Sequence, residues 1–182
     1  MRLYVDLDGT LIRNVVAPNG NVVEMIPRPG VESFLQKLSK DGDLWMLTAA
    51  DPSHAERAMK VLYPSSKLFK GVLTRRDMEP VREQLEVIFD EPLLNEETRW
   101  HLWGEVKPIA PPGIMFDDYP VGSGMFALKA ASIGIGPDEW VEVEQFDENK
   151  PDRRGLKKAY MEFRNRFPNL MMSGRKLAFS PL

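Results

Sequence analysis

Two aspartates stand one residue apart near the start of the chain, in the stretch "LYVDLDGTLI" of residues 3–12. In an extended chain the side chains of Asp6 and Asp8 point to the same side, because successive side chains alternate between faces. Both carboxylates can therefore address one reacting group. Gly9 follows and lets backbone N–H groups approach an anion closely, and Thr10 adds a hydroxyl.

Two later apolar stretches also end in polar residues. "LWMLTAA" carries Thr48 and Ala49 at its end, and "IMFDD" ends in Asp117 and Asp118. If all three stretches are parallel strands of one sheet, ligands bind beyond their carboxyl ends, where these groups converge. The sequence thus predicts one site built from three separate segments.

Four carboxylates at one site need a counter-charge. Each pair repels by roughly 1 kcal/mol at 4 Å in bulk water, and by more when partly buried. Mg²⁺ is the natural cation for an all-oxygen site, and it commonly also binds substrate phosphate. A phosphoryl group further needs donors around its oxygens, for which Thr10, Thr48 and a lysine are candidates. Lys107, just before the "IMFDD" stretch, is our first choice, and Lys70 is the alternative.

The elements that must position these residues alternate between strand and helix. Apolar runs predict strands over residues 2–7, 43–50, 67–74, 113–118 and 131–136. Helical periodicity with terminal signals predicts helices over residues 29–42, 51–62, 78–89, 95–103 and 120–130. A Pro-Asn-Gly turn predicts a hairpin flap over about residues 13–27. This order predicts a three-layer, Rossmann-like α/β fold with a parallel sheet, a β-hairpin flap and a minimal cap.

Composition limits the class of protein. The 182 residues, 43% hydrophobic and 28% charged, fit a single domain spanning residues 1–182. The absence of cysteine excludes disulfides and thiolate metal sites, and two histidines argue against a His-rich zinc site. No apolar run approaches about 18 residues and no basic-then-apolar leader opens the chain. We therefore expect a cytoplasmic protein without a membrane partner.

Charge is unevenly distributed along the chain. Residues 151–182 hold eight basic and two acidic residues, a net charge of +6, whereas the other 150 residues carry −9. Apolar residues at helical spacing in residues 151–168 predict an amphipathic C-terminal helix with a solvated basic face; a polyanion-binding surface is the alternative. Residues 75–105 form a small acidic insert of net charge −5, too small for a full lid.

In order, these motifs resemble those of the haloacid dehalogenase-like hydrolase superfamily. Its phosphatases carry a DxDxT motif after the first strand, matched at Asp6 and Asp8, and then an apolar strand ending in Ser or Thr, matched at Thr48. A lysine follows, matched at Lys107, and an acidic pair closes the set, matched at Asp117 and Asp118.

The resemblance implies a role for each residue. Asp6 would be the nucleophile that forms an aspartyl-phosphate, and Asp8 would donate and later accept a proton. Mg²⁺ would be held by the Asp6 carboxylate, the Asp8 backbone carbonyl, Asp117 and Asp118. Phosphate would be bound by Gly9, Thr10, Thr48, Ala49 and Lys107.

Within the superfamily, "RPGVESFLQKLSKDGDLWMLTAADPSHAERAM" is similar to the NLI-interacting-factor-like phosphatases, the group that contains the RNA polymerase C-terminal-domain phosphatases. Those enzymes usually have glutamate where this chain has Gly9. The resemblance implies a Mg²⁺-dependent phosphomonoesterase whose substrate is a small phosphoester, a phosphoprotein or a nucleic-acid end. A catalytically silent phosphoprotein-binding scaffold and a phosphotransferase are the alternatives. His54 and Arg57 either form a solvated helix face or contact substrate.

Overall fold

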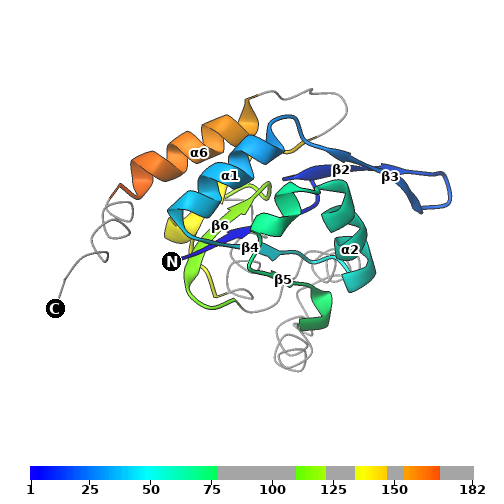
Figure 1. Cartoon of the computed structure of the whole chain (residues 1–182), viewed down its shortest axis with the longest axis horizontal. Helices are drawn as coiled ribbons and strands as arrows, with labels where there is room; N and C mark the ends of the chain where they lie inside the picture. Colours follow the sequence, from blue (N-terminus) through cyan, green and yellow to red (C-terminus); the bar gives the residue numbers. More distant parts are fainter. Residues whose placement is uncertain (78–109, 122–133, 147–153, 169–182) are drawn as a thin grey trace, which may run out of the picture.

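A computed structural model describes residues 1–77, 110–121, 134–146 and 154–168 of the chain. Its centre is a five-stranded sheet in the order β5-β4-β1-β6-β7, and every neighbouring pair is parallel (Figure 1). The strands are β1 (Arg2–Val5), β4 (Asp43–Leu47), β5 (Gly71–Leu73), β6 (Gly113–Asp117) and β7 (Trp140–Glu142). The predicted parallel α/β fold is confirmed.

The central strand β1 is buried on both faces, as strands of parallel sheets generally are. Leu3 and Val5 face a large core cluster, and Tyr4 between them faces a second cluster with Trp140. All four of these side chains are fully buried. Apolar residues along the whole strand therefore fix β1 in the middle of the sheet, with its carboxyl end leading directly into Asp6.

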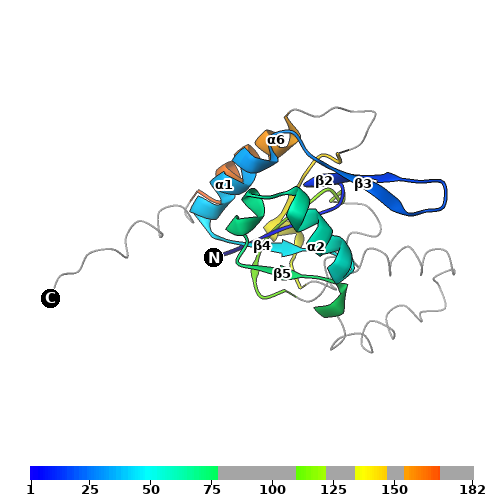
Figure 2. The same cartoon turned by 45° about the vertical axis from the view of Figure 1, so that its right-hand side comes forward.

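The helices α1 (Val31–Asp41), α2 (Pro52–Val61) and α6 (Gly155–Arg166) contribute residues to the first of these clusters. Figures 1 and 2 show α6 lying beside α1. Phe163 of α6 packs edge-on against Phe116 of β6, which in turn contacts Phe34 of α1. The predicted amphipathic C-terminal helix is confirmed, and its apolar face belongs to the core.

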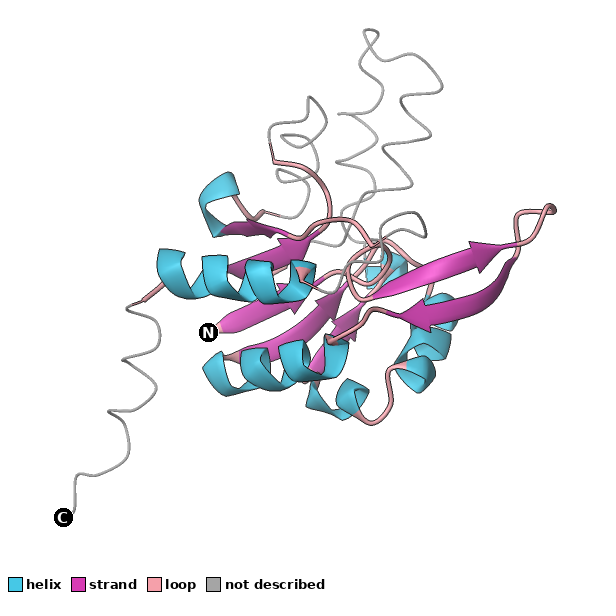
Figure 3. Ribbon diagram, turned by 90° about the horizontal axis from the view of Figure 1, so that it is seen from above, coloured by secondary structure: helices cyan, strands magenta, loops and turns pink. Residues whose placement is uncertain are grey.

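The hairpin of β2 (Ile12–Val16) and β3 (Val22–Pro27) forms a separate two-stranded sheet. It projects from the body of the molecule in Figures 1 and 3. Gly20, with φ of +81°, occupies the predicted turn, where an L side chain would be strained. The flap begins directly after the loop that carries Asp8, because β2 starts at Ile12.

Two predicted elements differ from the structure. The fifth strand is β7, not residues 131–136; the described part of that segment, 134–136, is not a strand, and Gly134 has φ of +76°, which an extended strand does not allow. The strand predicted over 67–74 is shorter, because Ser65–Leu68 form a 3₁₀ turn before β5. A second 3₁₀ turn, Pro137–Glu139, precedes β7.

Other predictions lie outside the described residues. They are the helices expected over 78–89, 95–103 and most of 120–130, together with most of the acidic insert of 75–105. Among the residues that are described, no helix combines the length and apolar character that crossing a membrane requires.

Candidate active site

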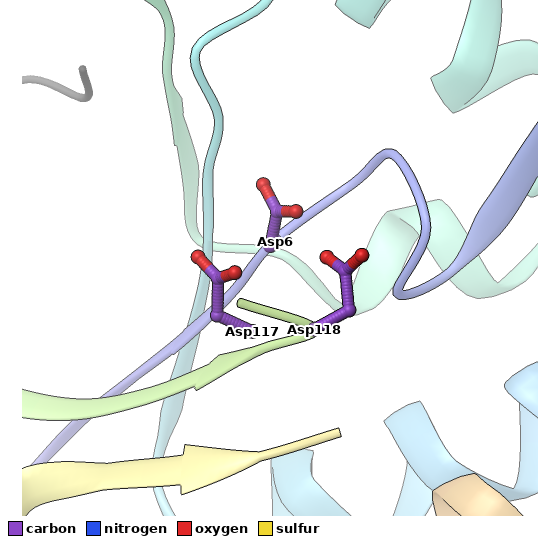
Figure 4. A group of neighbouring side chains, drawn as sticks. All are labelled: Asp6, Asp117 and Asp118. Atoms are coloured by element: carbon purple, nitrogen blue, oxygen red, sulfur yellow. The ribbon is translucent and has the colours of Figure 1, made fainter. Parts of the chain in front are cut away.

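Three carboxylates meet at the carboxyl ends of β1 and β6. Asp6 directly follows β1, and its N–H donates to the Phe116 carbonyl at 2.9 Å, which continues the pairing of the two strands by one residue. Asp117 ends β6 and Asp118 follows it. One carboxylate oxygen from each of the three lies within 4.8 Å of the others, and Figure 4 shows the side chains around a common space.

This three-carboxylate cluster fits a hard divalent cation. Asp117 is fully buried and Asp6 is only 6% exposed, so water screens their repulsion poorly. Oxygen donors bound to Mg²⁺ at about 2.1 Å lie within roughly 4.2 Å of one another across the ion, comparable to the spacing here. The donor set contains oxygen alone, as Mg²⁺ prefers.

Addition of Mg²⁺ is accordingly expected to raise the melting temperature. Stabilisation of about 2.7 kcal/mol is expected when the ion is present at a hundred times its Kd, which corresponds to a rise of roughly 5–10 °C for a chain of this size. Differential scanning fluorimetry against a KCl control of equal ionic strength measures it. In Asp117→Asn, which keeps the size of the side chain, the Mg²⁺-dependent rise should be largely lost; an equal rise in both proteins contradicts the site.

Backbone and hydroxyl donors fix the cluster in place. The Tyr119 N–H donates to Asp117 Oδ1 at 2.8 Å. The Thr10 hydroxyl accepts from the Asp118 N–H at 3.0 Å and donates to Asp118 Oδ1 at 3.2 Å. Thr10 is fully buried and is not among the residues that line the pocket described below. Its predicted contact with phosphate stays a prediction, whereas its observed partner is a carboxylate of the cluster.

Thr10→Val should therefore weaken the metal site more than the fold. The change removes both hydrogen bonds at nearly constant volume and leaves the Asp118 N–H without this partner, at a cost of about 1–3 kcal/mol. Loss of a group that orients a ligand typically lowers metal affinity about 10- to 100-fold. Mg²⁺ titration and urea unfolding measure the two effects. Thr10→Ser keeps the hydroxyl and should behave like the wild type; a Thr10→Val protein with unchanged Mg²⁺ affinity contradicts this role.

The loop after Asp8 is held from two sides by its backbone. The Phe146 N–H donates to the Gly9 carbonyl at 2.7 Å, and the buried Arg28 Nη1 donates to the Thr10 carbonyl at 3.2 Å. Gly9 has φ of +76°, and a Cβ placed on it would overlap the Asp118 carboxylate, whose Cγ would lie 2.8 Å away. A larger residue at position 9 would therefore strain the backbone and displace the Asp118 carboxylate.

The Asp8 carboxylate lies apart from the three-carboxylate cluster and has other partners. Asn14 Nδ2 of β2 donates to Asp8 Oδ1 at 2.7 Å, and His54 Nε2 of α2 lies 2.9 Å from the same oxygen. The Asp8 side chain is 38% exposed. Because its carboxylate is not in the cluster, any metal ligation by Asp8 would use another atom, as the predicted backbone carbonyl does.

A pocket of about 1110 Å³ opens over these residues. Its lining includes the predicted residues Asp6, Asp8, Gly9, Thr48, Ala49 and Asp118. Thr48 is buried, and its Oγ1 accepts from the Ala50 N–H at 3.1 Å, which leaves the hydroxyl proton available for donation. The structure therefore brings the first, second and fourth motifs to one cavity.

The motif-three lysine is not placed. Lys107 lies outside the described residues. Lys70 precedes β5, where its N–H donates to the Leu44 carbonyl at 2.7 Å. That position is at the amino end of the parallel strands, opposite the edge that carries Asp6, and Lys70 is not among the pocket-lining residues. The geometry thus disfavours Lys70 as the phosphate-binding lysine.

Three basic residues that line the pocket were not predicted as phosphate or metal ligands. Arg75 follows β5, and its N–H donates to the Ala50 carbonyl at 3.0 Å. Applying the strand-end rule to the third strand would have found it. Lys158 reaches the pocket from α6 and belongs to the basic tail already noted in the sequence. His54 was left open between a solvated face and substrate contact, and it contacts Asp8 instead.

Fold and site together define an α/β protein with an acidic pocket at the carboxyl ends of a parallel sheet. The family model described as NLI interacting factor-like phosphatase matches residues 2–89. The match includes Asp6, Asp8 and Thr48 and stops before Asp117. Residues 2–89 thus match the same family that the motifs resemble, which supports the resemblance seen in the sequence.

Two solved structures are also similar to this chain. One is a variant of the fission yeast RNA polymerase II CTD phosphatase Fcp1 bound to beryllium fluoride, at 21% identity and a TM-score of 0.47, covering 97% of this chain and 52% of that one. The other is Fcp1, an essential RNA polymerase II CTD phosphatase, at 18% identity and a TM-score of 0.48, covering 98% and 54%. This chain thus spans about half the length of each. Comparison with curated proteins found no match.

Proposed function

We propose that this chain is a Mg²⁺-dependent phosphomonoesterase that acts through an aspartyl-phosphate on Asp6. The single observation that carries the proposal is the meeting of Asp6, Asp117 and Asp118 at one edge of the sheet. Asp8 lines the same pocket as Asp6 and Asp118. The family match to residues 2–89 supports the same reaction class.

Each residue has a task that its position allows. Asp6, which lines the pocket, attacks the phosphorus, and a carboxylate is an established covalent nucleophile of this kind. Asp8, which is partly exposed, protonates the leaving oxygen and then takes a proton from the attacking water. Asp6, Asp117 and Asp118 would hold Mg²⁺, which supplies charge neutralisation for both the carboxylates and the phosphoryl oxygens.

Candidate donors for the phosphoryl group also line the pocket. The Thr48 hydroxyl and the segment that follows it lead into α2, whose amino end opens onto the pocket through Asp51 and His54. Helix amino ends favour anions. Arg75 adds a guanidinium on the pocket wall, where it can share the role predicted for Lys107.

The charge of the pocket favours a substrate with a single phosphate over a polyanion. Among the described residues, the wall from β7 to α6 carries Glu142, Glu144 and Glu162 against one cation, Lys158. This acidic wall opposes the approach of a nucleic acid. A phosphorylated protein segment or a small ester is therefore the proposed substrate class, and the large pocket admits either.

Turnover of a phosphomonoester panel tests the proposal. The panel contains p-nitrophenyl phosphate, sugar phosphates, a phosphoserine peptide and a 5′-phosphorylated oligonucleotide, each with and without Mg²⁺. We expect Mg²⁺-dependent release of phosphate, with the oligonucleotide the poorest substrate. Binding of the phosphopeptide without turnover would support a silent scaffold instead. Transfer of phosphate to an added alcohol acceptor in preference to water would support a phosphotransferase.

The C-terminal helix cannot be tested by deletion. Removing residues 151–182 would take Leu156, Ala159 and Phe163 out of the core, so the loss of activity would report unfolding. Lys158→Gln keeps that core and removes the one described cation on the acidic wall. If the basic tail serves a nucleic-acid end, this variant should lose more activity on the oligonucleotide than on p-nitrophenyl phosphate.

A further inference from the structure

The Asp8 carboxylate is held on one of its two oxygens by donors from two different elements. His54 Nε2, in the first turn of α2, lies 2.9 Å from Asp8 Oδ1. Asn14 Nδ2, on β2, donates to that same oxygen at 2.7 Å. Within the described part of the chain, no hydrogen bond is made to Asp8 Oδ2. The two oxygens of this carboxylate therefore have different environments.

We propose that His54 is a positioning residue that fixes Asp8 Oδ1, so that Oδ2 is the oxygen through which the proton moves. This inference rests on the proposed function and deepens it. As Asp6 bonds to phosphorus, the bond from phosphorus to the leaving oxygen breaks, and the proton of Asp8 Oδ2 passes to that oxygen. Water then attacks phosphorus, the bond to Asp6 breaks, and the proton released by the water returns to Asp8 Oδ2.

The arrangement suits a group that must donate and then accept. Oδ1 accepts hydrogen bonds both in the carboxylate and in the acid protonated on Oδ2, so His54 and Asn14 keep their contacts through both half-reactions. In this arrangement the His54 imidazole carries a proton on Nε2 and donates it in a hydrogen bond to Asp8 Oδ1. Holding a carboxyl in one orientation removes rotational freedom that the reaction would otherwise have to restrict.

His54 contacts Asp8 and is not one of the buried core residues of α2. The core residues of α2 are Ala55 and Ala58, whereas His54 lines the pocket and its side chain is 16% exposed. A change at His54 can therefore alter Asp8 with little loss of core packing. An acidic site with two donors on Asp8 is also better ordered than one in which Asp8 faces solvent alone.

The dependence of kcat/KM on the leaving group distinguishes a positioning role of His54 from a general loss of active-site structure. An aliphatic alcohol is a poor leaving group that needs a proton, whereas p-nitrophenolate needs little help. In His54→Leu, kcat/KM should fall roughly 10- to 100-fold for an alkyl phosphate and less than about threefold for p-nitrophenyl phosphate. His54→Gln, whose amide can reach Oδ1, should restore most of the alkyl phosphate activity. Glu56→Gln, on the exposed face of α2, is the matched control.

Asn14→Leu removes the other hydrogen bond to Asp8 Oδ1 and provides the test if His54→Leu does not fold. Its kcat/KM should depend on the leaving group in the same way. Equal losses of kcat/KM on both substrates, or a His54→Gln protein as impaired as His54→Leu, would overturn the positioning role while leaving the phosphatase proposal intact. Wild-type protein without turnover of either ester would instead overturn the proposed function, and this inference with it.

Discussion

Asp6→Asn is expected to abolish turnover, with kcat lowered roughly 10⁴-fold or more, as for the loss of other covalent nucleophiles. The amide is a poor nucleophile and a poor ligand for Mg²⁺. The side chain keeps its size and is only 6% exposed, so the fold should survive the change. Steady-state phosphate release with Mg²⁺ measures the effect.

The same variant should lose activity but gain thermal stability in the absence of metal. Removing one of three close carboxylates lowers the repulsion within the cluster by about 1 kcal/mol or more per pair. Metal-free Asp6→Asn should therefore unfold at a higher temperature than the metal-free wild type, and it should gain less from Mg²⁺. An active variant contradicts the assignment of Asp6 as nucleophile. A metal-free variant that unfolds at a lower temperature than the metal-free wild type contradicts the expected repulsion within the cluster.

Gly9→Ala is the second substitution with a large expected effect. A side chain there must adopt φ of +76°, and its Cβ would overlap the Asp118 carboxylate. Movement of Asp118 disturbs both the cluster and its bonds with Thr10. We expect about 1–3 kcal/mol of destabilisation and a loss of kcat/KM of roughly 100-fold, since small misplacements cost this much.

Gly20→Ala is the matched control for backbone strain. Gly20 has φ of +81°, close to that of Gly9, but a Cβ on it meets nothing within 4 Å. This variant should lose similar stability from the backbone alone and retain full activity. If Gly9→Ala and Gly20→Ala lose the same stability and neither loses activity, the contact between Gly9 and Asp118 has no role. Urea unfolding and steady-state kinetics on both variants decide this.

The sheet and the three-carboxylate cluster could be predicted from the sequence because both depend on local patterns. Apolar runs that end in polar residues identify β1, β4 and β6, and the parallel rule brings their ends together. The register of β1 against β6 then places Asp6 beside Asp117 without further information. The parallel arrangement of β1 and β6 is therefore enough to bring the first and fourth motifs together.

Contacts between elements could not be predicted in the same way. The Thr10 hydroxyl forms a hydrogen bond with Asp118, 108 residues away in the sequence. His54 contacts Asp8 because α2 begins at Pro52, soon after Thr48, and this places its first turn near the Asp8 loop. β7 was missed because it is three residues long, too short for a periodic pattern, while "ASIGIG" is more apolar. Side-chain partners depend on tertiary packing, which sequence periodicity does not specify.

In the proposed reaction, Asp6 carries the phosphoryl group as an aspartyl-phosphate. Sodium borohydride added during turnover of p-nitrophenyl phosphate reduces an aspartyl-phosphate to homoserine, and peptide mass spectrometry locates the change. Homoserine at position 6, dependent on both substrate and Mg²⁺ and absent from Asp6→Asn, is the predicted result. Turnover with an unmodified Asp6, or homoserine at position 8, would show that Asp6 is not the nucleophile.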